Sequence, residues 1–159
     1  MSASIRRVLV ANRGEIAVRV MRTCRERGLE TVAVYSDVDR LAPHVQLASA
    51  AVAIGPARAA DSYLSIPRLI DAARSTGAEA IHPGYGFLSE NASFAAACEA
   101  AGLVFVGPPA DVLARVGSKI TARQLMQDAG VPIVPGETPS DQSDRGIQAA
   151  IERVALPAL

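Results

Sequence analysis

Four side chains that could take part in chemistry lie within ten consecutive residues, at positions 82–91. His82 can accept or donate a proton, Tyr85 offers a hydroxyl group, Glu90 a carboxylate and Asn91 an amide. The glycines on either side of Tyr85 allow the backbone to make turns that other residues disfavour. Structural loops seldom carry so many different polar groups together, so this segment is a candidate binding or catalytic site.

Each of these side chains also has a purely structural interpretation. A histidine at a strand end is more often a hydrogen-bonded structural residue than a catalytic base. The ring of Tyr85 could simply pack, the carboxylate of Glu90 could accept amides of its own loop, and Asn91 is expected to be the N-cap of the next helix. The residue types alone leave both interpretations open for His82, Tyr85 and Glu90.

The 82–91 loop is expected to connect a buried strand, indicated by the mostly apolar segment 78–81, to a helix beginning at Ala92. The turn at 12–15 stands in the same position after an apolar run, before a helix with one apolar stripe. Ligands bind beyond the carboxyl ends of strands in a parallel α/β sheet. The 12–15 turn has a single glycine, whereas dinucleotide-binding turns have three in G-x-G-x-x-G spacing, which argues against NAD or FAD.

Strand and helix patterns alternate along the chain, which predicts an α/β fold: a Rossmann-like parallel sheet with helices on both faces. Residues 36–43 are expected to form a polar loop. Strands are expected at 5–11, 31–35, 51–54, 80–82 and 103–106, and helices at 15–27, after Ser65, at 92–101, after Pro109 and at 118–130. A last helix is expected with Asp144 as its cap.

Two motifs, Asn12-Arg13-Gly14-Glu15-Ile16-Ala17 and the 82–91 loop (His-Pro-Gly-Tyr-Gly-Phe-Leu-Ser-Glu-Asn), resemble those of the biotin carboxylases in order and spacing. These enzymes are ATP-grasp ligases that carboxylate biotin. The resemblance covers essentially the whole chain. It implies a biotin carboxylase N-terminal (pre-ATP-grasp) domain at 1–136, then a linker and the incomplete start of the ATP-grasp domain at 137–159, with a strand beginning near Val154.

The resemblance implies part of an enzyme that uses ATP, Mg²⁺ and bicarbonate to form carboxyphosphate and then carboxylates biotin held on another domain. The implied partners are a biotin carboxyl carrier domain, a carboxyltransferase and a second copy in a homodimer. The resemblance places Tyr85, Glu90 and His82 on the biotin side of the active site. The family's glycine-rich phosphate loop, metal ligands and bicarbonate-binding groups belong to later segments, so the chain is expected to be inactive alone, with no metal ligand or certain catalytic residue. The acceptor, whether an acyl-CoA, pyruvate or urea, is not indicated.

Lys119 is the single lysine among 16 basic residues. It follows Ser118, a good N-cap, so its ammonium group is expected in the first turn of a helix, where a cation opposes the helix dipole unless an anion binds there. A solvated lysine at a helix start is the structural alternative. The resemblance implies that Lys119 contacts ATP phosphate, although the family's Gly-Asp-Lys is Gly117-Ser118-Lys119 here.

Composition excludes several classes of protein. The formal net charge is zero, with 16 basic and 16 acidic side chains, so neither a nucleic-acid partner nor a polyanion-binding surface is indicated. No apolar run is long enough for a membrane span. Cys24 and Cys98 lack the spacing of a metal site or a disulfide framework. The first strand leaves no room for a signal peptide, so a reducing cytoplasm is the expected location.

Two other functions stay open at this stage. One is a Rossmann-type nucleotide-binding module, which the single-glycine turn opposes. The other is a non-catalytic scaffold that dimerises through its helix faces, for which the arginine-rich N-terminal segment could supply contacts. The helix from Asp144 has an apolar stripe that needs a partner. It could dock back on the first domain, but we favour the interpretation that it opens a second domain.

Overall fold

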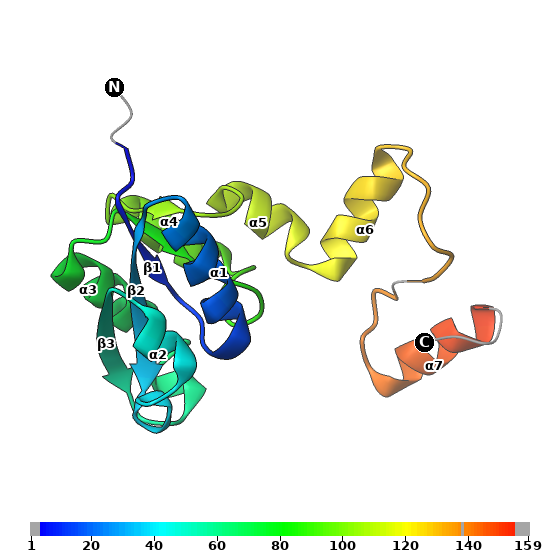
Figure 1. Ribbon diagram of the computed structural model, residues 1–159. Helices are drawn as coiled ribbons and strands as arrows, with labels where there is room; N and C mark the ends of the chain where they lie inside the picture. The colour runs from blue at the N-terminus through cyan, green and yellow to red at the C-terminus, as the bar shows by residue number, and fades with distance from the viewer. Residues whose placement is uncertain (1–3, 138, 155–159) are drawn as a thin grey trace. The chain divides into compact units, whose positions relative to one another are not determined.

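The computed structural model describes residues 4–137 and 139–154. The chain divides into two compact units, the first ending at Ala114 and the second beginning at Arg115. The strands are β1 (Arg7–Val10), β2 (Glu30–Ser36), β3 (Ala50–Gly55), β4 (Ala80–His82) and β5 (Val104–Phe105). The helices, shown in Figure 1, are α1 (Gly14–Glu26), α2 (Pro43–Leu47), α3 (Ile66–Thr76), α4 (Ala92–Ala100), α5 (Ala110–Val116), α6 (Lys119–Asp128) and α7 (Asp144–Arg153).

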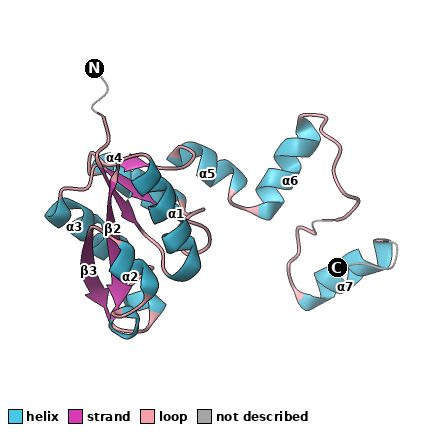
Figure 2. Ribbon diagram, viewed as in Figure 1, coloured by secondary structure: helices cyan, strands magenta, loops and turns pink. Residues whose placement is uncertain are grey.

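Within residues 4–137 and 139–154, the strands form one five-stranded parallel sheet in the order β3-β2-β1-β4-β5. The apolar strand β1 is central, and Leu9 pairs with Val32 of β2 on one side and Ile81 of β4 on the other. Each connection between successive strands contains a helix, as parallel pairing requires. Figure 2 distinguishes the strands from the helices that flank them. The predicted α/β fold with a parallel sheet is therefore confirmed.

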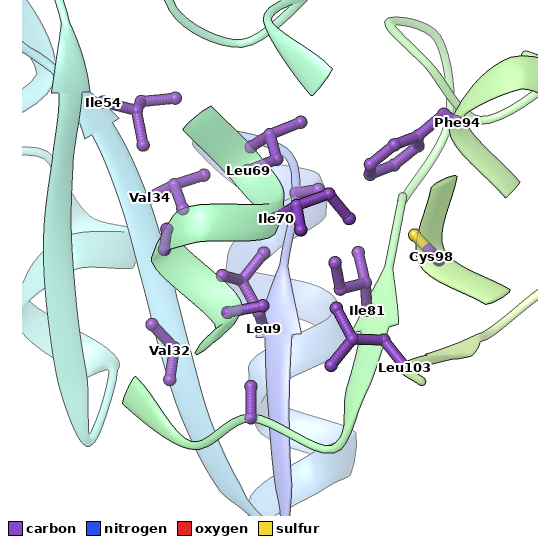
Figure 3. Packing of buried hydrophobic residues seen from close by; sticks show 14 of the residues in the cluster. Leu9, Val32, Val34, Ile54, Leu69, Ile70, Ile81, Phe94, Cys98 and Leu103 are labelled. Atoms are coloured by element: carbon purple, nitrogen blue, oxygen red, sulfur yellow. The ribbon is translucent and has the colours of Figure 1, made fainter. Parts of the chain in front are cut away.

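One face of the sheet carries the main hydrophobic core (Figure 3). Leu69 and Ile70 of α3, together with Phe94 and Cys98 of α4, pack against apolar side chains of β1, β2 and β4. Phe94 is fully buried and meets the ring of Phe105 edge-on, with centroids 5.8 Å apart. Truncation of such an aromatic side chain costs about 3–5 kcal/mol. Helix α4, and with it the end of the 82–91 loop, is therefore held firmly on the sheet.

Helices α1 and α2 cover the opposite face. Ala17 and Met21 of α1 pack against Val10 and Ala33 of the sheet. Cys24, one turn further along α1, packs beside the neighbouring part of β1 and β4. These residues form the apolar stripe expected from their helical spacing. With α3 and α4 on the other side, helices cover both faces as predicted.

Two local expectations were wrong. Residues 36–43 were predicted to be a loop, but they contain a 3-10 turn at Asp37–Asp39, and α2 begins at Pro43. Five-residue helices such as α2 are too short to show a periodic pattern, and this one is held by tertiary packing of Val45 and Ala48 near α1. Helix α7 was predicted to be capped by Asp144, but the Ser143 hydroxyl is the cap and accepts a hydrogen bond from the amide of Gly146 at 3.3 Å.

The second unit contains α6 and α7. The Arg123 guanidinium donates to the carbonyl oxygens of Val134 and Gly136, both at 2.8 Å, so the segment after α6 folds back on that helix. Arg153 pairs with Glu137 at 2.7 Å. The strand expected to begin near Val154 falls on 155–159, outside the described residues. In the part of the chain that the structure describes, no helix has the length and apolar character needed to cross a membrane.

Candidate functional site

The two motifs identified in the sequence meet at one edge of the sheet. Strands β1 and β4 are parallel neighbours in which Val10 pairs with His82, and the ladder continues where the amide of Ala11 donates to the His82 carbonyl at 2.9 Å. The 12–15 turn follows β1 and the 82–91 loop follows β4. Both therefore lie at the carboxyl edge of the strands, where ligands bind in open α/β sheets.

Asn12 joins the two motifs. Its Nδ2 donates to the carbonyl oxygens of Pro83 at 2.8 Å and Tyr85 at 2.7 Å, and its Oδ1 accepts from the Arg13 amide at 2.9 Å. The side chain is buried. Gly84 packs directly against this side chain, and a Cβ atom at position 84 would lie 2.6 Å from Nδ2 of Asn12. The φ of Gly84, +68°, also favours glycine. The sequence had shown Asn12 only as part of a motif, without a role.

Tyr85 is exposed, and its hydroxyl donates a hydrogen bond to the carboxylate of Glu15. This bond is the main reason why the pKa of Tyr85 is raised above its ordinary value. Tyr85 borders two open hollows. One, of about 380 Å³, is also lined by Arg19 and His82, and the other, of about 370 Å³, by Glu15 and Phe87. The ring is thus presented at the surface, beside both hollows.

His82 is half-buried, and its Nδ1 accepts a hydrogen bond from the amide of Gly84 at 3.0 Å. Burial lowers the pKa of His82, which favours the neutral imidazole that this acceptor role requires. The contact holds the start of the loop, as the structural interpretation of this histidine expects.

Glu90 lies on the exposed side of the loop. Among the described residues its carboxylate has no hydrogen bond and no ion pair, so it does not hold the loop by accepting amides. The next residue, Asn91, accepts from the amide of Phe94 at 2.9 Å and caps α4, as predicted. The carboxylate of Glu90 is therefore available to a group outside this unit.

A polar network around the buried Asp39, next to the loop, could not be predicted from the sequence. Arg13 binds Asp39 through two hydrogen bonds, Nε to Oδ2 at 2.7 Å and Nη2 to Oδ1 at 2.5 Å. Asp39 also accepts from the Tyr63 hydroxyl at 2.7 Å and the Ser36 hydroxyl at 3.1 Å. The bonds from the Arg13 guanidinium are the main reason why the pKa of Asp39 lies far below its usual range. The one feature of the sequence that pointed toward this network was the position of Arg13 next to Asn12 in the first motif.

The network supports the loop through an aromatic stack. The ring of Tyr63 lies parallel to that of Phe87, with an interplanar angle of 1° and centroids 5.3 Å apart. Phe87 has a φ of +43°, a backbone conformation that non-glycine residues rarely adopt. The stack and the buried Leu88 that follows fix this strained residue. The chain is therefore held in place both before and after the exposed Tyr85, at Pro83 and at Phe87.

Lys119 belongs to the second unit. It is the first residue of α6 and is exposed, and the Ser118 hydroxyl caps the helix by accepting from the Thr121 amide at 3.4 Å. The helix start was thus predicted correctly. The hollow in this unit, of about 580 Å³, is lined by residues that include Arg123 and Glu137 but not Lys119. Across the described residues, no three His, Cys, Asp or Glu side chains gather as metal ligands would.

A family model described as "Biotin carboxylase, N-terminal domain" matches residues 4–113. Biotin carboxylase 1 of Bacillus subtilis (strain 168) is 57% identical over 132 residues, which covers 83% of this chain and 29% of the relative. The mitochondrial methylcrotonoyl-CoA carboxylase subunit alpha of Dictyostelium discoideum is 48% identical over 155 residues, 98% of this chain and 22% of the relative.

A similar solved structure is the biotin carboxylase domain dimer of the Hydrogenobacter thermophilus 2-oxoglutarate carboxylase, in complex with MgADP, ADP and bicarbonate. Its TM-score is 0.87 at 43% identity, covering 98% of this chain and 34% of that chain. The chain thus spans between 22% and 34% of the length of these three proteins.

Proposed function

Because this chain belongs to the family of biotin carboxylase N-terminal domains, we propose that it forms one wall of an active site in which ATP and bicarbonate are used to carboxylate biotin. One observation carries this proposal. The loops after β1 and β4 meet at the carboxyl edge of the sheet and present Tyr85 and Glu90 outward while their backbone is anchored inside. Such an arrangement suits a rigid surface that faces a substrate held partly by another domain.

The side chains of the 82–91 loop divide into two groups in this proposal. Tyr85 and Glu90 are proposed to face the biotin side, as the family resemblance implies, and the exposure of their side chains supports this. His82 acts as a neutral acceptor that fixes the beginning of the loop. A domain covering 1–136, followed by a linker and the start of an ATP-grasp domain at 137–159, remains our proposed division of the chain.

Lys119 is proposed to bind ATP phosphate. The first turn of α6 offers backbone amides without helical partners beside the ammonium group, a combination that favours an anion. The solved relative contains Mg²⁺ with ADP, and we assign no ligand of Mg²⁺ to the chain.

A biotin carboxyl carrier domain and a carboxyltransferase are the partners that we propose, with a second copy of the chain as in the dimeric relative. The relatives bear the names of different acceptors, methylcrotonoyl-CoA and 2-oxoglutarate, so we propose no particular acceptor. The two free cysteines, Cys24 and Cys98, are both buried and are compatible with a reducing compartment such as the cytoplasm.

A chimeric enzyme tests the proposal. The segment of the Bacillus subtilis relative that matches this chain is replaced by residues of this chain, and ATP hydrolysis that depends on bicarbonate and biotin is measured. We expect turnover by the chimera and none by the 159-residue chain alone. Tyr85→Ala in the chimera should raise the apparent KM for biotin more than that for ATP, because Tyr85 lies on the biotin side.

The matched control is a chimera carrying the corresponding segment of the Dictyostelium discoideum relative. If the control chimera turns over and the chimera with this chain is folded but inactive, the proposed function is wrong. Turnover by the isolated chain would contradict the view that it forms only one wall of the site.

A further inference from the structure

The geometry points to Asn12 as a positioning residue, whose buried carboxamide determines where the Tyr85 side chain is presented. The inference deepens the proposed function, since it rests on Tyr85 facing the biotin side. Asn12 itself contacts no substrate in this assignment. It acts through the backbone of the 82–91 loop and through the turn that it shares with Glu15.

The carboxamide of Asn12 takes the place of a strand partner for the loop. Beyond His82 the sheet ladder ends, and the next carbonyl groups of the loop need other donors. Nδ2 supplies a donor to Pro83 and another to Tyr85, at 2.8 and 2.7 Å, so both of its hydrogens are used. Because Oδ1 accepts from the Arg13 amide, the amide orientation is fixed as well.

Tyr85 is held at both ends by the same turn. Asn12 binds its backbone carbonyl oxygen, and Glu15, three residues later, accepts from its hydroxyl. The turn is itself fixed by β1 before it and by α1 after it, where Ile16 and Ala17 are buried. The tyrosine therefore takes its position from the rigid sheet and α1 rather than from the loop alone.

The two hydrogen bonds from Asn12 Nδ2 to the carbonyl oxygens of Pro83 and Tyr85 form a clamp on the loop. The close packing of Gly84 against the Asn12 carboxamide is a second observation that supports this clamp. A side chain at this position would meet Nδ2 of Asn12 at 2.6 Å and its Cβ and Cγ at 3.0 Å. Real Cβ atoms do not approach that closely, so the carboxamide or the loop would have to move. The clamp can thus be broken from either side, by changing Asn12 or by adding a methyl group at Gly84.

The test uses the 159-residue chain with ¹³C-labelled tyrosine, and NMR follows two properties of Tyr85: the NOE between its ring and the Glu15 side chain, and the pKa of its phenol. In Asn12→Ala we expect the NOE to be lost and the pKa to fall toward its ordinary value, because the bond to Glu15 raises it. Gly84→Ala should give the same pair of changes. Glu15→Gln is the positive control for the pKa readout.

Asn91→Ala is the matched control, because it also removes an asparagine hydrogen bond from the loop but touches only the amide of Phe94. Its Tyr85 signals should stay as in the wild-type chain. Protected amides of β1 and β4 show that each variant is folded. Unchanged Tyr85 signals in folded Asn12→Ala or Gly84→Ala would overturn the inference. Global unfolding of both variants would overturn it too, because Asn12 would then hold the fold rather than one side chain.

These measurements need neither ATP nor biotin. An inactive chimera combined with displaced Tyr85 signals would reject the proposed function and leave the positioning role intact. An active chimera whose Asn12→Ala form keeps the wild-type KM for biotin and the wild-type Tyr85 signals would reject the positioning role alone.

Discussion

Tyr63→Phe removes a single hydroxyl group from the buried network beside the loop and should cost more stability than its size suggests. The hydroxyl donates to ionised Asp39 at 2.7 Å and accepts from the amide of Ser36 at 3.0 Å. A hydrogen bond to a charged group contributes about 1.5–3 kcal/mol, and a buried amide left without an acceptor costs about 1–3 kcal/mol. Asp39 keeps its bonds from Arg13, so we expect the lower half of that sum, about 2.5–4 kcal/mol.

The phenylalanine ring preserves the stack on Phe87, so the loss should come from the hydroxyl alone. We would measure the free energy of unfolding in urea from the native amide signals of β1 and β2, because the chain has two units and a global signal would mix them. Tyr35→Phe is the control: Tyr35 is half-exposed on β2, and its hydroxyl has no partner in the described residues. If both substitutions cost less than about 0.5 kcal/mol, as ordinary surface changes do, the network does not stabilise this edge of the sheet.

Three further outcomes are expected. Burial lowers the pKa values of His44 and His82 in the folded chain below their ordinary value of 6.5. The unfolded chain therefore takes up protons at these histidines first, and the urea midpoint should fall as the pH drops through about 6.5. The urea midpoint should fall again below pH 3.8, because protonation of Asp39 removes the stability that its lowered pKa supplies at higher pH. A urea midpoint that stays constant from pH 7 to 5 would contradict the histidine prediction. In the chimera, Lys119→Gln should raise the apparent KM for ATP roughly ten- to a hundredfold and that for biotin far less, whereas unchanged ATP kinetics would reduce Lys119 to a solvated helix start. Helix α7, whose Ile147 and Ile151 remain 41% and 49% exposed, should exchange its amides faster than β1, and equal protection would show that it docks on a stable surface.

Elements with strong local signals were predicted well from the sequence. Apolar runs located the central strands, and the apolar stripe that follows the 12–15 turn at helical spacing identified the buried side of α1. The N-caps Asn91 and Ser118 were found because a capping side chain acts within three residues of itself. The two loop motifs were enough to indicate the biotin carboxylase family, which the match over residues 4–113 confirms.

Tertiary structure alone decided how the candidate site is held together. Asn12 and Tyr85 are 73 positions apart, and Arg13 and Asp39 are 26 apart. Neither pair follows a spacing rule, because contacts between loops depend on which strands are neighbours and where each strand ends. The chain order β1-β2-β3-β4-β5 becomes β3-β2-β1-β4-β5 in the sheet, and the pairing of β1 with β4 brings the two motifs together. The residue types thus determined which chemistry the chain could offer, and the strand order determined which of those residues meet, because only parallel neighbours place their carboxyl ends side by side.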